Sequence, residues 1–275
     1  MLFRSKLEFD KVKENYFNEK FEITVTKAEK FLSEYTKSDF GFDVKYFLAD
    51  SYFKTKQIDA AKETYAEVID EKKSTYLNRS IQKLADVYFE ENDFSNASKY
   101  YLLLSTKAAN KKEEYNAWNG LMQCFYENKS LDSSLIFTDK ILNNTSPSII
   151  FTNKALLFKG KILRDKTNVN AKNWFLKCLN EADDQHGAEA MYLLCSLMYD
   201  ENQNKQSLEL LFELTNKFAI YEKWIGKSFL LISDNYIKLG EIYQAKATLL
   251  SIIEKAKDEK LIALAKEKLS KIDNP

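Results

Sequence analysis

The chain has 275 residues, of which 45% are hydrophobic and 30% charged, so it can bury a sizeable core and is not expected to be disordered. Its 41 Lys and Arg residues balance its 41 Asp and Glu residues, and no Lys/Arg-rich block stands out, which argues against a nucleic-acid binder. Only 6 Gly and 2 Pro are present, fewer than the turns of a sheet protein require, so the composition favours an all-α fold.

A short motif recurs along the chain at an interval of 36 or 37 residues. LADSYF at 48–53 is followed by LADVYF at 84–89 and by LMQCFY at 121–126. Aligned on its aromatic position, the series runs through Tyr16, Tyr52, Tyr88, Phe125, Ile162, Tyr199 and Tyr236. Small residues follow the aromatic position in most repeats, at Ala61, Ala97, Ser134, Ala171 and Ala245. A fixed period of this length indicates a stack of helical repeats.

Each repeat reads as two amphipathic helices joined by a short polar turn. Val44, Leu48 and Tyr52 are spaced four residues apart, and Ala61 and Tyr65 repeat this spacing after the turn KTKQ. The small side chain of Ala61 permits a close approach of the two helix backbones. A helix pair this short cannot bury its apolar face alone, so it must stack on its neighbours in a solenoid.

In chain order, we expect a single solenoid domain over residues 1–275. Its helix-pair units are expected near 5–40, 42–77, 78–114, 115–151, 152–188, 189–225 and 226–260. The segment LIALAKEKLSKI at 261–272 reads as a last amphipathic helix that caps the final apolar face.

The pattern resembles the tetratricopeptide repeat family. The residues that carry the resemblance are Leu48-Ala49-x2-Tyr52 with Ala61, Tyr65 and Val68; Ile81-x2-Leu84-Ala85-x2-Tyr88 with Ala97, Tyr101 and Leu104; and Trp118-x2-Leu121-Met122-x2-Phe125 with Ser134. The resemblance implies an all-α, right-handed superhelix of about seven helix pairs plus a C-terminal capping helix. The period exceeds the family's usual length of about 34 residues, and the proline that normally ends a unit is missing except at Pro147.

The sequence does not indicate catalysis, so we expect no enzyme, no cofactor and no metal site. His186 is the single histidine, and the surrounding EADDQHGAE reads as a solvated loop rather than a metal site or a catalytic triad. Cys124, Cys178 and Cys195 fall on apolar helix faces and are expected to be small buried hydrophobic residues.

In the resembling family, the first helix of each pair lines a concave groove, and the residues between the core positions face it. Here those residues are Tyr46, Asp50, Phe53, Arg79, Gln82, Asp86, Phe89, Asn116, Asn119, Gln123 and Tyr126, with Lys227, Asp234 and Ile237 in the last unit. Aromatic rings beside amides and acids suit an extended peptide. The alternative is that the aromatic residues pack under the next repeat and the acids are solvated.

Some co-chaperones of this family clamp a terminal carboxylate with Lys and Asn side chains. The matching positions here carry Asp50, Asp86 and Gln123. Because acids repel a carboxylate, the clamp is expected to be absent and a basic or neutral peptide is favoured.

We therefore expect a non-enzymatic scaffold that binds a protein or peptide partner. The alternative is a self-assembly module, with a homodimer contact at the less polar middle units, or a spacer domain of a larger bacterial envelope protein. The chain contains no apolar run of about 18 residues, so no membrane span is expected. Its first residues do not read as a secretory signal, which leaves the cytoplasm, or the periplasm if a signal or anchor was removed.

Overall fold

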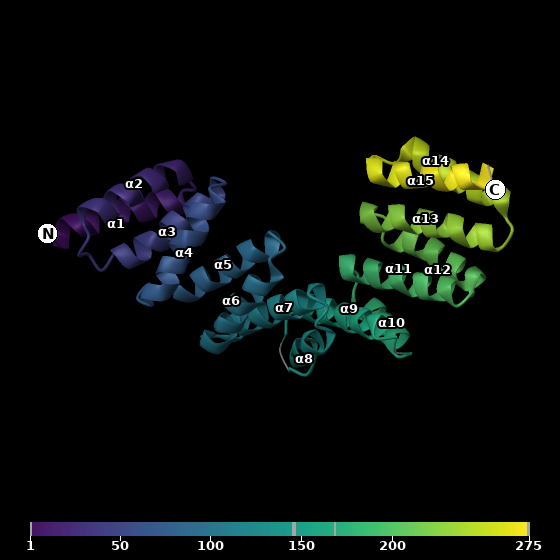
Figure 1. Ribbon diagram of the computed structural model, residues 1–275, viewed down its shortest axis with the longest axis horizontal. Helices are drawn as coiled ribbons and strands as arrows, with labels where there is room; N and C mark the ends of the chain where they lie inside the picture. Colours follow the sequence, from purple (N-terminus) through teal and green to yellow (C-terminus); the bar gives the residue numbers. More distant parts are fainter. Residues whose placement is uncertain (1, 145–146, 168, 274–275) are drawn as a thin grey trace. The chain divides into compact units, whose positions relative to one another are not determined.

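The computed structural model describes residues 2–144, 147–167 and 169–273. Most of these residues lie in helices, which are joined by short polar turns. Within these ranges the chain forms fifteen helices and no strand. Fourteen of the helices follow one another along the chain as seven antiparallel pairs, and the fifteenth packs on the last pair (Figure 1). The predicted all-α architecture of seven helix pairs plus a final helix is confirmed.

The helices fall into two units, an N-terminal unit of residues 1–140 and a C-terminal unit of residues 141–275. The first holds α1 (Leu2–Phe17), α2 (Phe21–Glu34), α3 (Gly41–Lys54), α4 (Ile58–Glu71), α5 (Leu77–Glu90), α6 (Phe94–Lys107), α7 (Lys111–Glu127) and most of α8 (Leu131–Leu142). The second holds α9 (Ile149–Asp165), α10 (Ala171–Glu181), α11 (Gln185–Asp200), α12 (Asn204–Lys217), α13 (Glu222–Lys238), α14 (Ile242–Lys255) and α15 (Glu259–Asp273). We call the odd-numbered helices α1–α13 the A helices and the even-numbered ones the B helices.

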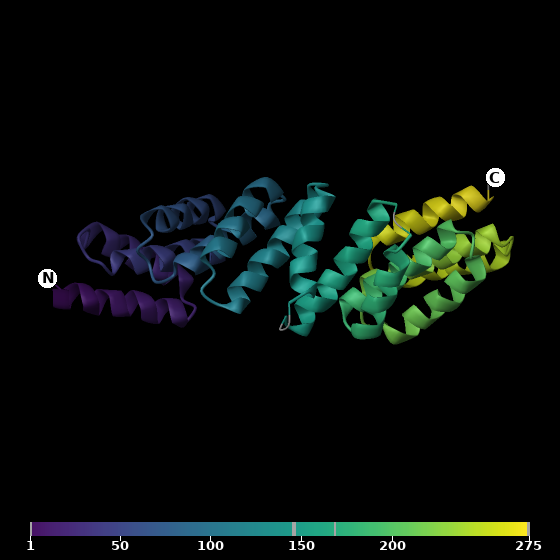
Figure 2. The ribbon, with the colours of Figure 1, turned by 90° about the horizontal axis from the view of Figure 1, so that it is seen from below.

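The core lies between the two helices of each pair and between successive pairs, which follow one another within each unit in the order of the chain (Figure 2). The small residues of the repeat are at the helix crossings: Ala61, Ala97, Ser134 and Ala245 are all 0% exposed. The large residue four positions later is buried as well, at Tyr65, Tyr101, Thr138, Phe175, Leu211 and Leu249. The periodicity therefore marks the residues that hold each pair together.

The turn from an A helix to its B helix has the same backbone geometry in most pairs. Lys56 adopts a positive φ of 66° after α3. Its N–H donates to the carbonyl of Phe53 at 3.1 Å, and the N–H of Gln57 donates to the carbonyl of Tyr52 at 2.8 Å. These two bonds form a Schellman motif. The same pair of bonds follows α1, α5, α7, α11 and α13, with the positive φ at Glu19, Asn92, Lys129, Asn202 and Gly240.

The environment of His186 corrects one prediction from the sequence. The predicted solvated loop is wrong, because α11 begins at Gln185 and His186 is only 8% exposed. Asp184 starts the helix early: one oxygen of its carboxylate accepts the N–H of His186 at 2.8 Å, and the other lies 3.0 Å from His186 Nδ1. The hydrogen bonds to His186 hold the pKa of Asp184 below its usual range, against the opposite effect of burial.

The cysteine prediction is confirmed, since Cys124, Cys178 and Cys195 are free and each is 0% exposed. Among the described residues, no three His, Cys, Asp or Glu side chains are grouped as metal ligands would be. No helix in the described ranges combines the length and the apolarity that crossing a bilayer requires.

Candidate functional site

Asp50 lies inside the N-terminal unit rather than on its surface. Its side chain is buried, and its two oxygens accept hydrogen bonds of 2.8 Å each from the hydroxyls of Tyr16 and Tyr65. Lys83 Nζ lies 3.4 Å from one of them. Burial and the adjacent carboxylate together raise the pKa of both tyrosines far above the usual value. Asp50 therefore joins four helices, and its charge is already neutralised from within the chain.

The next repeat contains the same arrangement in a more open form. Tyr101 donates a 2.5 Å hydrogen bond to the carboxylate of Asp86, which is half-buried. Burial raises the pKa of Asp86, although the Tyr101 hydroxyl and the nearby Lys83 oppose that change. The ring of Tyr101 lies against Gly120 of α7, where a Cβ atom would come within 2.5 Å of it. One oxygen of the Asp86 carboxylate is thus already bonded to a tyrosine of its own repeat.

Amide side chains form a polar row on α5 and α7. Asn116 Nδ2 donates to Gln82 Oε1 at 3.1 Å, and Gln123 Nε2 donates to the backbone carbonyl of Asn119 at 3.1 Å. The side-chain oxygen of Asn119 is buried and accepts no hydrogen bond from any described residue. We call Gln82, Asn116, Asn119 and Gln123 the amide row. Buried polar atoms are rarely left without a partner, so the Asn119 oxygen is an acceptor whose donor the described residues do not supply.

Partly exposed aromatic and basic side chains lie on α3 and α5. Phe53 is half-buried, with Lys83 Nζ 5.8 Å from its ring centroid. Phe89 is also half-buried and packs edge-on against Phe94 at 5.2 Å between centroids. Arg79 is exposed on α5. Each of these side chains keeps part of its surface open to solvent.

The predicted residues Tyr46 and Tyr126 do not face solvent. Tyr46 is 4% exposed and stacks on Tyr76, with centroids 4.5 Å apart and an interplanar angle of 4°. Tyr126 is 7% exposed. Of the predicted residues, the structure leaves eight partly or fully exposed and buries three. The eight are Phe53, Arg79, Gln82, Asp86, Phe89, Asn116, Asn119 and Gln123, on α3, α5 and α7, and the three are Tyr46, Asp50 and Tyr126.

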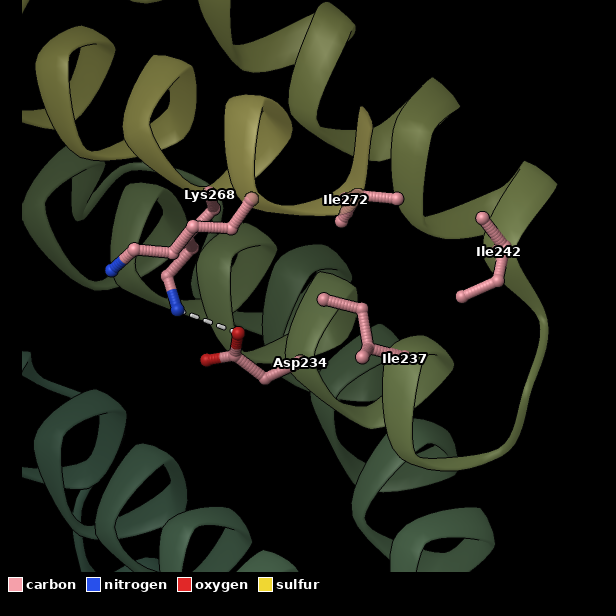
Figure 3. Close-up of a pocket in the computed structure, with 6 residues that line it drawn as sticks. Asp234, Ile237, Ile242, Lys268 and Ile272 are labelled. Atoms are coloured by element: carbon pink, nitrogen blue, oxygen red, sulfur yellow. Dashed lines mark hydrogen bonds and ion pairs between the residues drawn. The ribbon is translucent and has the colours of Figure 1, made fainter. Parts of the chain in front are cut away.

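The C-terminal unit contains a pocket of ≈ 540 Å³ between α13, α14 and α15 (Figure 3). Ile237, Ile242 and Ile272 supply an apolar lining. At its edge, Lys268 Nζ forms an ion pair of 2.6 Å with Asp234, as the dashed line in Figure 3 shows. The repeat pattern had indicated the α13 residues, but it missed those of α14 and α15. The i, i+4 spacing of Lys268 and Ile272 on the last amphipathic helix is the signal that could have found them.

Comparison with known proteins identifies one repeat directly. A family model for the tetratricopeptide repeat matches residues 42–75, which span α3 and α4. The match includes Asp50 and Tyr65. A search of curated protein sequences finds no match.

Solved structures with the same fold cover nearly the whole chain. A tetratricopeptide repeat protein from Parabacteroides merdae is 11% identical with a TM-score of 0.64, and the match covers 98% of this chain and 99% of that one. The C-terminal part of a TPR repeat-containing protein from Cytophaga hutchinsonii is 13% identical with a TM-score of 0.66, covering 93% and 98% of the two chains. The apo form of the quorum sensor NprR from B. thuringiensis is 14% identical with a TM-score of 0.67, covering 98% and 81%.

At these identities the likeness concerns the fold alone. The family model thus identifies one tetratricopeptide repeat at residues 42–75, and the solved structures show that the described helix pairs share the fold of tetratricopeptide repeat proteins.

Proposed function

We propose that the chain is a non-enzymatic scaffold and that the amide row of its N-terminal unit binds an extended segment of a partner protein. The observation that carries the proposal is the buried side-chain oxygen of Asn119, which accepts no hydrogen bond from the described residues. Leaving such an oxygen without a donor costs about 1–3 kcal/mol. A backbone N–H of a bound segment would supply the donor.

The neighbouring side chains suit an extended main chain. Amide groups both donate and accept, so the amide row matches the alternating N–H and C=O groups of a peptide without selecting a particular side chain. Phe53 on α3 and Phe89 on α5 are half-buried, and their exposed surface offers apolar contact at low entropic cost. Because Asp50 is neutralised within the fold, this surface favours an uncharged segment over a strongly basic one.

Replacing Asn119 with Leu tests the proposal, because Leu has nearly the same size but cannot form hydrogen bonds. Peptides selected from a random display library on the wild-type chain serve as probes, and their affinities are measured by fluorescence anisotropy. We expect Asn119→Leu to weaken binding about tenfold, since one hydrogen bond in a closed site contributes about that much.

A matched control is available in the C-terminal unit. Asn204 on α12 also has a buried side-chain oxygen without a partner among the described residues, so Asn204→Leu makes the same chemical change elsewhere. Both variants are first checked for wild-type melting behaviour. If the selected peptides bind Asn119→Leu as tightly as wild type, the amide row is not the binding site.

Self-association is the second candidate, favoured by the outer side of α1. Phe3 is 87% exposed, Phe17 is 58% exposed and Leu7 is 49% exposed. Apolar side chains gathered in this way often mark contact surfaces. Sedimentation of wild type against Phe3→Ser/Leu7→Ser distinguishes the two candidates, because a wild-type monomer removes the second one.

A further inference from the structure

Lysines from two A helices gather on one surface of the C-terminal unit. Lys154 and Lys161 are seven residues apart on α9, and Lys223 and Lys227 are four apart on α13, so each pair shares one side of its helix. The intervening helix α11 contacts both α9 and α13. We call these four residues the lysine cluster.

Side chains of α11 connect the two halves of the cluster. Glu189 forms an ion pair of 3.1 Å with Lys161. One helical turn further on, the ring centroid of Tyr192 lies 5.7 Å from Lys227 Nζ. Lys227 Nζ also lies 4.7 Å from the ring centroid of Trp224 on its own helix. The cluster is therefore a continuous surface across α9, α11 and α13.

The positive charge of this surface is only partly balanced. Lys154 is half-buried, and it forms no hydrogen bond or ion pair with any described residue. Burial lowers the pKa of Lys154, and the charge of Lys161 lowers it further. Burial likewise lowers the pKa of Lys227, as do Lys223 and Lys161 to a smaller extent. Glu189 is the acid that acts on both, and it is already paired.

The chemistry of the surface favours carboxylates over a nucleic acid. Trp224 is 7% exposed and lies under the lysines, so it offers no open ring on which a base could stack. The cluster is short, and the whole chain has a formal net charge of zero, unlike the long basic surfaces that follow a phosphate backbone. Ammonium groups set about one helical turn or two apart suit neighbouring carboxylates on a flexible segment.

We propose that the lysine cluster binds a segment of a partner protein that carries clustered Asp and Glu residues. This site lies in the other unit from the amide row and does not depend on it. The acidic side chains of the segment would supply the negative charge that Lys154 and Lys227 do not receive from the described residues of their own chain.

A titration of the full chain with an acidic peptide tests the proposal. The probe is a fluorescent peptide of alternating Glu and Asp residues, and its counterpart has Gln and Asn in the same order. We expect the acidic peptide to bind, its affinity to fall as salt is added, and the amide counterpart not to bind. An acidic peptide that does not bind, or an amide counterpart that binds equally well, would overturn the proposal.

Charge-removing variants then locate the site. We expect Lys154→Gln/Lys227→Gln to weaken binding about tenfold, and Glu189→Gln to strengthen it because it removes the competing acid. Lys205→Gln/Lys255→Gln removes the same net charge from exposed positions on α12 and α14, and we expect it to have little effect. Equal losses in the two double variants would show attraction to net charge alone.

A DNA oligonucleotide of equal charge provides the last comparison. Binding of the oligonucleotide in preference to the acidic peptide would assign the cluster to another class of partner and refute the proposal. Because Lys→Gln and Glu→Gln are expected to act in opposite directions, a general loss of folding cannot imitate the predicted result.

Discussion

The hydroxyl of Tyr65 donates a 2.8 Å hydrogen bond to the buried carboxylate of Asp50, fifteen residues earlier in the chain. Tyr101 makes the same bond to Asp86 at the same separation in the next repeat. An aspartate of the A helix and a tyrosine of the B helix thus fasten each of these two pairs internally. The acids that look most like ligand contacts in the sequence are engaged in structural bonds.

Removing the Tyr65 hydroxyl is expected to destabilise the fold. In Tyr65→Phe the buried carboxylate of Asp50 loses one of its donors, and a hydrogen bond to a charged group contributes about 1.5–3 kcal/mol. Urea denaturation measures the change in the free energy of unfolding. Tyr243→Phe is the control, because Tyr243 is 84% exposed. Equal stability of the two variants would contradict a structural role for this bond.

The stability contributed by Asp86 should depend on pH in a direction set by its environment. Burial raises the pKa of Asp86 in the folded chain above the ordinary value of 3.8, so the folded state holds the proton more tightly than the unfolded state does. Ionised Asp86 therefore opposes folding at neutral pH. This penalty is lost as the pH falls through the raised folded pKa toward 3.8.

Asp86→Asn isolates this contribution, because the amide oxygen can still accept the Tyr101 hydrogen bond. We expect the variant to be more stable than wild type at neutral pH, and the difference to shrink as the solution is acidified. Chemical denaturation of both proteins over a pH series measures the difference. A difference that grows on acidification would refute this explanation.

The turns after the A helices offer a test of backbone strain. Lys129 has a positive φ of 60°, which costs a residue with a side chain about 1 kcal/mol relative to Gly. Lys129→Gly should therefore raise the melting temperature. Gly240 has a φ of 79°, and a Cβ atom there would meet nothing within 4 Å, so Gly240→Ala should destabilise through the backbone alone. Changes of the same sign in both variants would contradict the explanation.

Glycines inside helices should respond according to what lies beside them. A Cβ atom on Gly120 would come within 2.5 Å of the Tyr101 ring, whereas one on Gly41 would make an ordinary contact of 3.7 Å with Leu32. We expect Gly120→Ala to destabilise by about 1–3 kcal/mol through overpacking. Gly41→Ala should be neutral or stabilising, since Ala favours the helix. Thermal unfolding compares the two, and similar losses would count against the packing argument.

The three cysteines are expected to be unreactive in the folded chain. Burial raises the pKa of each thiol to about 12, so almost no thiolate is present at neutral pH. A thiol reagent should label them only at the rate of unfolding, with full labelling in denaturant. Rapid labelling of the native chain would show that at least one cysteine is accessible.

Much of the fold could be predicted because the same core positions recur in each repeat. Ala61 and Ala97 are small because two helices cross there, and the regular spacing reveals them without any structure. The loop predicted around His186 is wrong because the helix begins where the Asp184 carboxylate accepts the His186 N–H, while the surrounding acids and glycine are typical of a loop. The start of a helix that depends on one capping side chain is harder to infer from sequence than a buried helix face whose pattern recurs in seven repeats.

The candidate site could be predicted only in part. Alternation along α3 separates Leu48 from Asp50, but it does not reveal that Tyr16 and Tyr65 from two other helices reach that carboxylate. The recurrence of Asp and Tyr fifteen residues apart is the signal that could have shown it. The lysine cluster is harder still, because its members come from different repeats and share no common repeat position.

The Schellman turns described above have a consequence for how such a chain can change over time. Their two bonds join backbone groups only, so the turn between an A helix and its B helix does not require any particular side chain. Turns as different as KTKQ, ENDF and KLGE therefore close the same hairpin. Copies of one helix hairpin can therefore differ in their turn sequences and still keep the same backbone geometry. Selection is then free to act on the surfaces that each copy presents.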